Sequence, residues 1–159
     1  DHEDFENALK FSLKCLGIEE AVYGGNHPDT ATSCNKIAGL YYKQGDHEKA
    51  LEYFLKSLEI KESVYGDDHP DIALACNNIA GLYYNQGEAE KALEYYHKSL
   101  DIYKSLYGDI HPMIVTCYSN LAVVYHNQGE AEKALEYQVK FLALKKALSG
   151  DDSGDDETN

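Results

Sequence analysis

The sequence predicts an all-α protein, a right-handed α-solenoid of about seven helices packed as antiparallel pairs. Two observations predict this fold class. A 42-residue unit that opens with Y-G-x-x-H-P recurs in tandem, beginning at Tyr23, Tyr65 and Tyr107. Within each unit, apolar residues recur at helical spacing, and strand-type alternation is absent. A fixed period of about 20–50 residues is typical of arrays in which each unit packs against its neighbours.

The period also divides the chain into parts. The first two full copies are identical at 27 of 42 aligned positions, so one structural unit has been duplicated. The predicted parts are the second helix of a partial repeat at 1–22, full repeats at 23–64, 65–106 and 107–148, and a disordered acidic tail at 151–159. Residues 1–150 therefore form one repeat array, and the Asp-, Gly- and Ser-rich tail has too few apolar residues to fold.

The first helix of each full repeat has start and stop signals. Pro28 suits the first helical position, where its missing N–H would be unpaired anyway. Asp29 places a carboxylate beside the positive end of the helix dipole. Ile37 and Tyr41 follow at helical spacing, and Gly45 ends the helix in a left-handed turn. The later repeats carry the same proline and the same glycine.

The second helix follows almost at once, and in the first full repeat we expect it over 46–65. Asp46 supplies the acidic residue at its start. Its apolar stripe consists of Ala50, Leu51, Phe54, Leu58 and Ile60. Because the connecting loop is only about three residues long, the two helices must be antiparallel neighbours.

The charge balance narrows the possible partners. The formal net charge is −14, and all 14 basic residues are lysines. A strongly negative surface repels phosphate groups and anionic lipids, so we expect neither nucleic acid nor a membrane surface as a partner. The sequence also has no run of about 18 apolar residues that could span a bilayer.

The residues that could carry chemistry predict neither an enzyme nor a metal or cofactor site. The cysteines Cys15, Cys34, Cys76 and Cys117 are spaced as reduced, packed thiols, which favours a cytoplasmic protein. His27, His69 and His111 lie one repeat apart, too far to share a metal ion, so we expect them to cap helices. The repeated glutamates precede lysines by four residues on the second helix, as exposed ion pairs do.

At this point the residues carry a family resemblance. The pattern of Ala38, Tyr41, Gly45, Ala50 and Phe54 resembles the tetratricopeptide repeat, with small residues where paired helices cross. The 42-residue period and the run N-N-I-A-G-L-Y-Y at 77–84 are similar to the longer, kinesin light chain type of that repeat. The resemblance covers nearly the whole chain, and it implies a protein-interaction scaffold or adaptor.

The resemblance also implies that the first helices line a concave groove for an extended peptide segment. The implied groove positions are Thr32, Asn35, Lys36, Gly39, Tyr42 and Lys43, then Leu74, Asn77, Asn78, Gly81, Tyr84 and Asn85, then Thr116, Ser119, Asn120, Val123, His126 and Asn127. Asparagines can pair with any peptide backbone, and glycines allow its close approach. Val123 and His126 replace glycine and tyrosine, so we expect the best site over the first two full repeats.

Kinesin light chains bind cargo peptides in which a tryptophan is flanked by acidic residues, and the resemblance implies that mode. This chain has no arginine and offers Lys36 and Lys43 in the groove. We therefore expect neutral or mildly basic peptides to bind at least as well as acidic ones.

Two alternatives remain open at the level of sequence. The array could be a structural spacer, or it could self-associate through its end helices, where Phe5, Leu9 and Leu13 lack a partner helix and Val139 and Phe141 add apolar surface. It could also be the recognition arm of a larger signalling protein. Both alternatives keep the same all-α array.

Overall fold

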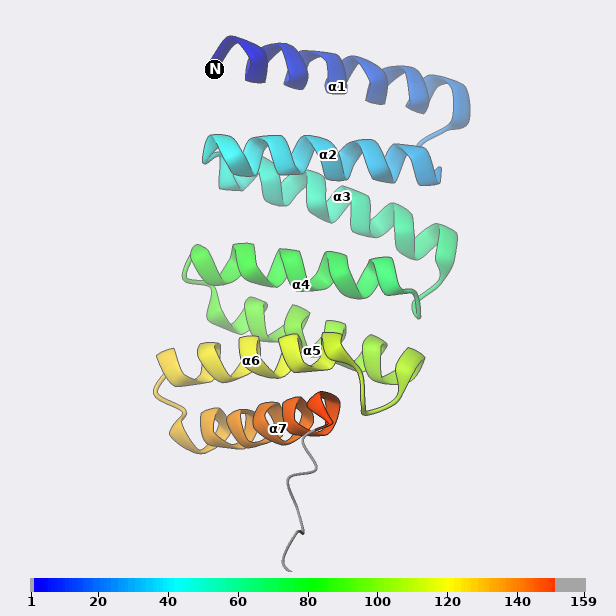
Figure 1. Cartoon of the computed structure of the whole chain (residues 1–159). Coiled ribbons are helices and arrows are strands. Elements are labelled where there is room, and N and C mark those ends of the chain that lie inside the picture. Colours follow the sequence, from blue (N-terminus) through cyan, green and yellow to red (C-terminus); the bar gives the residue numbers. More distant parts are fainter. Residues whose placement is uncertain (1, 151–159) are drawn as a thin grey trace, which may run out of the picture.

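The chain folds into a stack of helix pairs, described over residues 2–150 by a computed structural model. The helices of this part of the chain are α1 (His2–Tyr23), α2 (Pro28–Gln44), α3 (His47–Tyr65), α4 (Pro70–Asn85), α5 (Ala89–Tyr107), α6 (Pro112–Asn127) and α7 (Ala131–Ser149). Figure 1 shows them stacked in chain order from α1 to α7. The predicted all-α superhelix is confirmed, and the acidic tail predicted at 151–159 lies outside the described residues.

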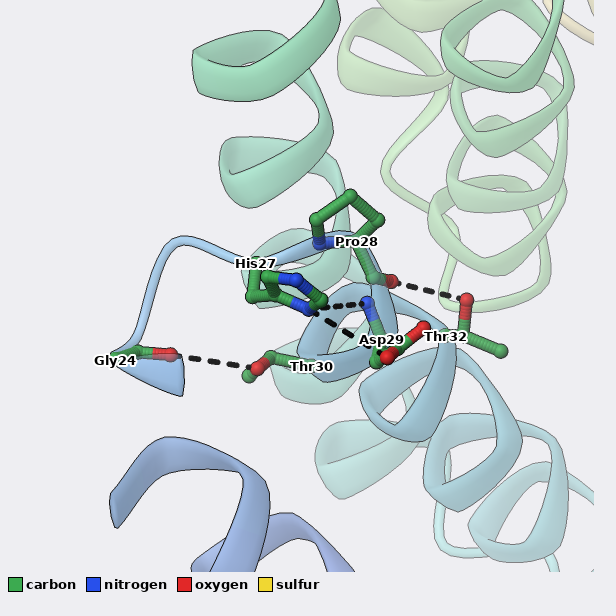
Figure 2. Close-up of polar contacts among 6 residues, drawn as sticks. All are labelled: Gly24, His27, Pro28, Asp29, Thr30 and Thr32. Atoms are coloured by element: carbon green, nitrogen blue, oxygen red, sulfur yellow. Dashed lines mark hydrogen bonds and ion pairs between the residues drawn. The ribbon is translucent and has the colours of Figure 1, made fainter. Parts of the chain in front are cut away.

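A histidine caps the first helix of every pair. The Nδ1 atom of His27 accepts a hydrogen bond from the backbone N–H of Asp29 at 3.2 Å (Figure 2), and its ring stacks on Tyr23 with centroids 4.5 Å apart. The cap satisfies an N–H that has no partner inside the first turn. The same cap recurs at His69 and His111. These histidines are therefore helix caps, and among the described residues no group of His, Cys, Asp and Glu could hold a metal ion.

Each pair is closed by a glycine turn. Gly45 has a φ of 85°, the left-handed conformation that lets the chain reverse direction within a few residues. Its N–H donates to the carbonyl of Tyr42 at 3.0 Å. Asp46 then caps α3, because its carboxylate accepts from the backbone N–H of Lys49 at 3.1 Å. The turn makes α2 and α3 antiparallel neighbours.

Small residues bring the helices of a pair into close contact. Ala38 on α2 and Ala50 on α3 are both fully buried, as predicted for positions where paired helices cross. A buried hydrogen bond adds to this contact in two of the pairs. The Ser57 hydroxyl donates to the carbonyl of Ala31, and the Ser99 hydroxyl donates to that of Ala73, each at 2.8 Å. In α7 the equivalent residue is Phe141, which cannot make this bond.

Ion pairs tie some second helices together across the stack. The Lys56 ammonium lies 2.7 Å from the carboxylate of Glu20, and the Lys98 ammonium lies 2.5 Å from that of Glu62. The next equivalent position carries Lys104, so Lys140 pairs instead with Glu136 of its own helix. Such exposed pairs contribute little stability, roughly 0–1 kcal/mol each.

The end helices expose apolar faces, but the prediction for α1 was wrong. Leu9 and Leu13 are not uncovered, because they pack on the core formed with α2. The exposed apolar side chains of α1 are instead Phe11 and Ile18, the latter 56% exposed. Phe11 and Ile18 are seven residues apart, so they lie on one face of α1. Their equivalents in α3 are Tyr53 and Ile60, which face α2, the first helix of the same pair. At the other end, Leu135, Val139 and Leu142 of α7 are exposed, whereas Phe141 is partly buried.

Truncating the matched pair Ile60 and Ile18 should show that nearest-neighbour packing sets stability. Ile60 is 4% exposed and Ile18 is 56% exposed at the equivalent position of α1. We expect Ile60→Ala to lower the free energy of unfolding by about 2–5 kcal/mol. Ile18→Ala should change it by less than about 0.5 kcal/mol. Urea denaturation followed by circular dichroism measures both, and equal effects would contradict the packing described.

Candidate functional site

The predicted groove residues lie on α2, α4 and α6, and each of them is exposed or half-buried. Their surroundings differ at the two places where full repeats meet. We call the contact between the α2–α3 pair and the α4–α5 pair the first joint. The contact between the α4–α5 pair and the α6–α7 pair is the second joint. The two joints place equivalent residues side by side, so differences between them reflect particular substitutions.

A pocket of about 400 Å³ opens at the first joint. It is lined by the predicted residues Tyr42, Asn77, Asn78, Gly81 and Asn85, together with Phe54, Leu82 and Tyr96. Leu82 and Tyr96 are almost fully buried and form apolar wall, whereas Asn78 and Asn85 are exposed at the rim. None of these eight lining residues carries a charge. We call this hollow the first-joint pocket.

The first-joint pocket combines apolar side chains with the amide groups of three asparagines. A glycine keeps part of it open: a Cβ added at Gly81 would lie 3.6 Å from the Tyr96 hydroxyl, which is ordinary contact. The asparagine side chains can donate and accept hydrogen bonds. Apolar pockets with a few polar groups are the usual form of a binding site. The arrangement can take a large uncharged side chain and pair with the backbone beside it.

Three lining residues were missed by sequence reasoning. Phe54 and Tyr96 lie on the second helices, and their helical spacing is equally consistent with a core role. One signal in the sequence could have identified Phe54 and Tyr96 as pocket residues, because the equivalent position of α7 carries the polar Gln138. A position that tolerates both an aromatic and an amide side chain is not fully enclosed by the core.

Several predicted groove residues lie outside the first-joint pocket. The Thr32 hydroxyl donates to the carbonyl of Pro28 in its own helix at 3.0 Å. Lys36 and Lys43 are exposed on α2, and Leu74 is 46% exposed on α4. Also outside are Asn35, Gly39, Tyr84, Thr116, Ser119, Asn120, Val123, His126 and Asn127. The peptide-binding role of all these residues stays a prediction.

The second joint is closed by side-chain hydrogen bonds. Asn120 donates to the side-chain oxygen of Asn77 at 2.9 Å, and Asn127 donates to the hydroxyl of Tyr84. Asn77 is therefore already paired across this joint, but its oxygen keeps a second lone pair and its NH₂ group can still donate, so its pairing with a peptide backbone stays a prediction. Beyond this joint, Ser119, Ala122, Val123, His126, Gln138 and Phe141 line a smaller hollow of about 250 Å³.

One titratable group is half-buried at the second joint. His97 lies between α6 and α7, with Nε2 3.1 Å from the hydroxyl of Tyr125 and its ring edge against Tyr137. Burial lowers the pKa of His97, with a raising contribution from Asp101 and a lowering one from Lys140. A neutral imidazole is therefore favoured in the folded chain.

The three buried cysteines show no activation as nucleophiles. Burial raises the pKa of Cys76 to about 11, and it also raises the pKa values of Cys34 and Cys117. These thiols are protonated at neutral pH, whereas a reactive cysteine needs a lowered pKa.

Comparison with known proteins identifies the repeat. The sequence profile of the tetratricopeptide repeat matches residues 2–63, 34–80 and 71–147. The chain belongs to the tetratricopeptide repeat family. Such repeats are generally protein-interaction modules and are typically non-catalytic. No curated protein matches the sequence significantly. Within the described residues, no helix of this repeat domain is long and apolar enough to cross a membrane.

Solved tetratricopeptide structures share the fold at low sequence identity. BtubC (BKLC) from P. vanneervenii has a TM-score of 0.86 and 22% identity over 99% of this chain, which spans 63% of that chain. A putative kinesin light chain from Podospora anserina has a TM-score of 0.78 and 19% identity over 96% of this chain and 71% of that one. The TPR domain of Arabidopsis FLU has a TM-score of 0.64 and 24% identity over 76% of this chain and 96% of that chain. At these identities the likeness shows a kinesin light chain-like fold.

Replacing His97 by leucine, the residue at the equivalent position 55, should remove one pH dependence of stability. The folded-state pKa of His97 is lowered from its ordinary value of 6.5, so in acid the unfolded chain binds a proton more readily than the folded chain. The free energy of unfolding conferred by His97 should be constant above about pH 7 and fall as the pH drops through about 6.5.

Urea titrations of the wild type and His97→Leu at neutral and mildly acidic pH measure this difference. Other titrating groups are common to both proteins, so the difference between them isolates His97. The same loss of stability in both proteins on acidification would show that His97 is not responsible.

Proposed function

We propose that the chain is a protein-interaction module that binds an extended peptide along α2 and α4. In this proposal one large uncharged side chain of the peptide enters the first-joint pocket. The observation that carries it is the pocket of about 400 Å³ with apolar walls and asparagines at its rim. Membership of the tetratricopeptide repeat family supports a protein or peptide partner.

The charge distribution supports a preference among peptides. The pocket lining is uncharged, and the whole chain carries a net charge of −14. Lys36 and Lys43 are the basic residues at the predicted groove positions of α2. A long-range negative field disfavours acidic ligands, and two exposed lysines offset only part of it. We therefore propose that neutral or mildly basic peptides bind at least as tightly as acidic ones.

Filling the first-joint pocket should weaken peptide binding. The probe is a capped Gly-Ser-Trp-Ser-Gly peptide, whose tryptophan fluorescence is free of interference because the chain has no tryptophan. Gly81→Val places a branched side chain in the pocket, as Val123 does at the equivalent position of α6. We expect it to weaken binding by about tenfold or more, the loss typical of a blocked hot-spot pocket.

Gly17→Val is the matched control. A Cβ at Gly17 would meet nothing within 4 Å, and Gly17 lies on α1, outside the pocket and the predicted groove positions. Equal losses in the two variants would contradict binding at the pocket. Versions of the peptide with aspartate or lysine in place of serine test the charge preference in the same assay. Tighter binding of the aspartate version by about tenfold or more would overturn that preference.

A second candidate function is self-association with another copy of the chain. The observation that favours it is the apolar face at each end of the stack, where Ile18 is 56% and Leu142 is 62% exposed. The equivalent residues Ile60 and Leu100 are almost fully buried by neighbouring helices. A second copy could cover these end faces, since exposed contiguous apolar patches often mark interfaces.

Sedimentation velocity across a concentration series tests self-association. We expect the wild type to gain mass with rising concentration. The double variant Ile18→Lys, Leu142→Lys should remain monomeric, because lysine ammonium groups would have to be desolvated at the interface. A matched control places lysine at Leu74, an exposed apolar residue of α4 in the middle helix pair. A wild type that is monomeric throughout the series would contradict this function.

A further inference from the structure

The two joints contain the same pairs of polar residues in different states. At the second joint, Asn127 donates to Tyr84. The equivalent residues of the first joint are Asn85 and Tyr42, so the residue types are unchanged. Within the described part of the chain, however, no hydrogen bond joins Asn85 to Tyr42. Both side chains instead line the first-joint pocket. Residue type at these two positions therefore does not explain which joint is open.

A neighbouring position differs between the two joints. The ring of Tyr42 packs edge-on against His47, with centroids 5.4 Å apart and planes at 60°. His47 is the first residue of α3, and the first residue of α5 is Ala89. Alanine has no ring, so Tyr84 has no such partner at this position. Tyr42 thus has a ring contact at the α2–α3 turn that Tyr84 lacks, and Tyr84 instead accepts the hydrogen bond from Asn127.

The exposure of the two tyrosines agrees with this explanation. Tyr42 is 46% exposed, whereas Tyr84 is half-buried and packs against the main core. A second substitution acts in the same direction, because Val123 of α6 replaces the glycine that keeps the first-joint pocket open at position 81. The second joint is therefore closed by a hydrogen bond, and a branched side chain stands at the position equivalent to Gly81.

We propose that His47 is the positioning residue that keeps the first joint open for a ligand, so that the chain holds one ligand side chain at a time. The proposal rests on the proposed peptide-binding function and adds where the ligand binds and which residue selects that place. His47 acts through Tyr42, and the ligand pairs with the Asn85 amide that Tyr42 leaves free. At the second joint Ala89 stands in place of histidine, so Tyr84 accepts the hydrogen bond from Asn127 and the joint is closed.

Binding of the capped Gly-Ser-Trp-Ser-Gly peptide, measured by titration calorimetry, tests the selection of the site. The wild type should bind one peptide per chain. His47→Ala should weaken binding by about tenfold, because Tyr42 can then close on Asn85. His47→Ala introduces the residue that α5 and α7 carry at their first positions, so it should fold normally. The combined variant Ala89→His, Val123→Gly should bind a second peptide.

A measurement without ligand tests the same geometry. In the wild type, Tyr84→Phe and Asn127→Ala should have non-additive effects on the unfolding equilibrium constant, by about two- to tenfold for one neutral hydrogen bond. Tyr42→Phe and Asn85→Ala should be additive. In the His47→Ala background, the pair Tyr42 and Asn85 should become non-additive. In the Ala89→His background, the pair at the second joint should become additive.

The two experiments separate the inference from the proposed function. If the wild type fails to bind the peptide but the four cycles behave as stated, that form of the peptide-binding function is wrong and the positioning role of His47 stands. If the peptide binds and His47→Ala leaves both its affinity and the additivity of Tyr42 and Asn85 unchanged, the role of His47 is overturned. Two peptides bound per wild-type chain would overturn the single site.

Discussion

Nearest-neighbour packing is the constraint on which the rest of the structure depends. Each helix pair buries its apolar face against the pair before it and the pair after it, since an array has no common central core. Ile60 is almost fully buried because α2 covers it, whereas Ile18 has no covering helix among the described residues and is exposed. The same constraint places the pocket at a joint, where side chains of two pairs meet and need not fill the space between them completely.

Because the repeats that form the joints are closely similar in sequence, single substitutions between them can be compared directly. Tyr42 and Tyr84 occupy equivalent positions, yet one contacts His47 and the other receives a hydrogen bond from Asn127. The helices that carry them are capped and turned in the same way. A polar side chain that can reach either of two partners contacts the partner that is present, so a change of one residue can change the contact.

Sequence predicted the helices and their caps well, because the signals are local. Pro28 and Gly45 act within one turn of the backbone, and His27 bonds to an N–H two residues away. The exposed face of α1 could not be predicted with equal success. Leu9 and Phe11 are both apolar and two residues apart, and which of them faces α2 depends on how the helices cross. Phe54 was missed at the pocket for a related reason, since wall and core positions share one apolar stripe.

The hydrogen bonds across the joints are even harder to predict from the sequence. Asn120 and Asn77 are 43 residues apart, and only the stacking angle between α4 and α6 brings their amides together. Equivalent residues of the same type make different contacts at the two joints, which points to a further residue as the cause of the different contacts. A perfectly regular array would offer an equal site at every joint to a repetitive ligand. The differences at positions 47, 89 and 123 break this equivalence, so under the proposed function the array would recognise one segment in one register.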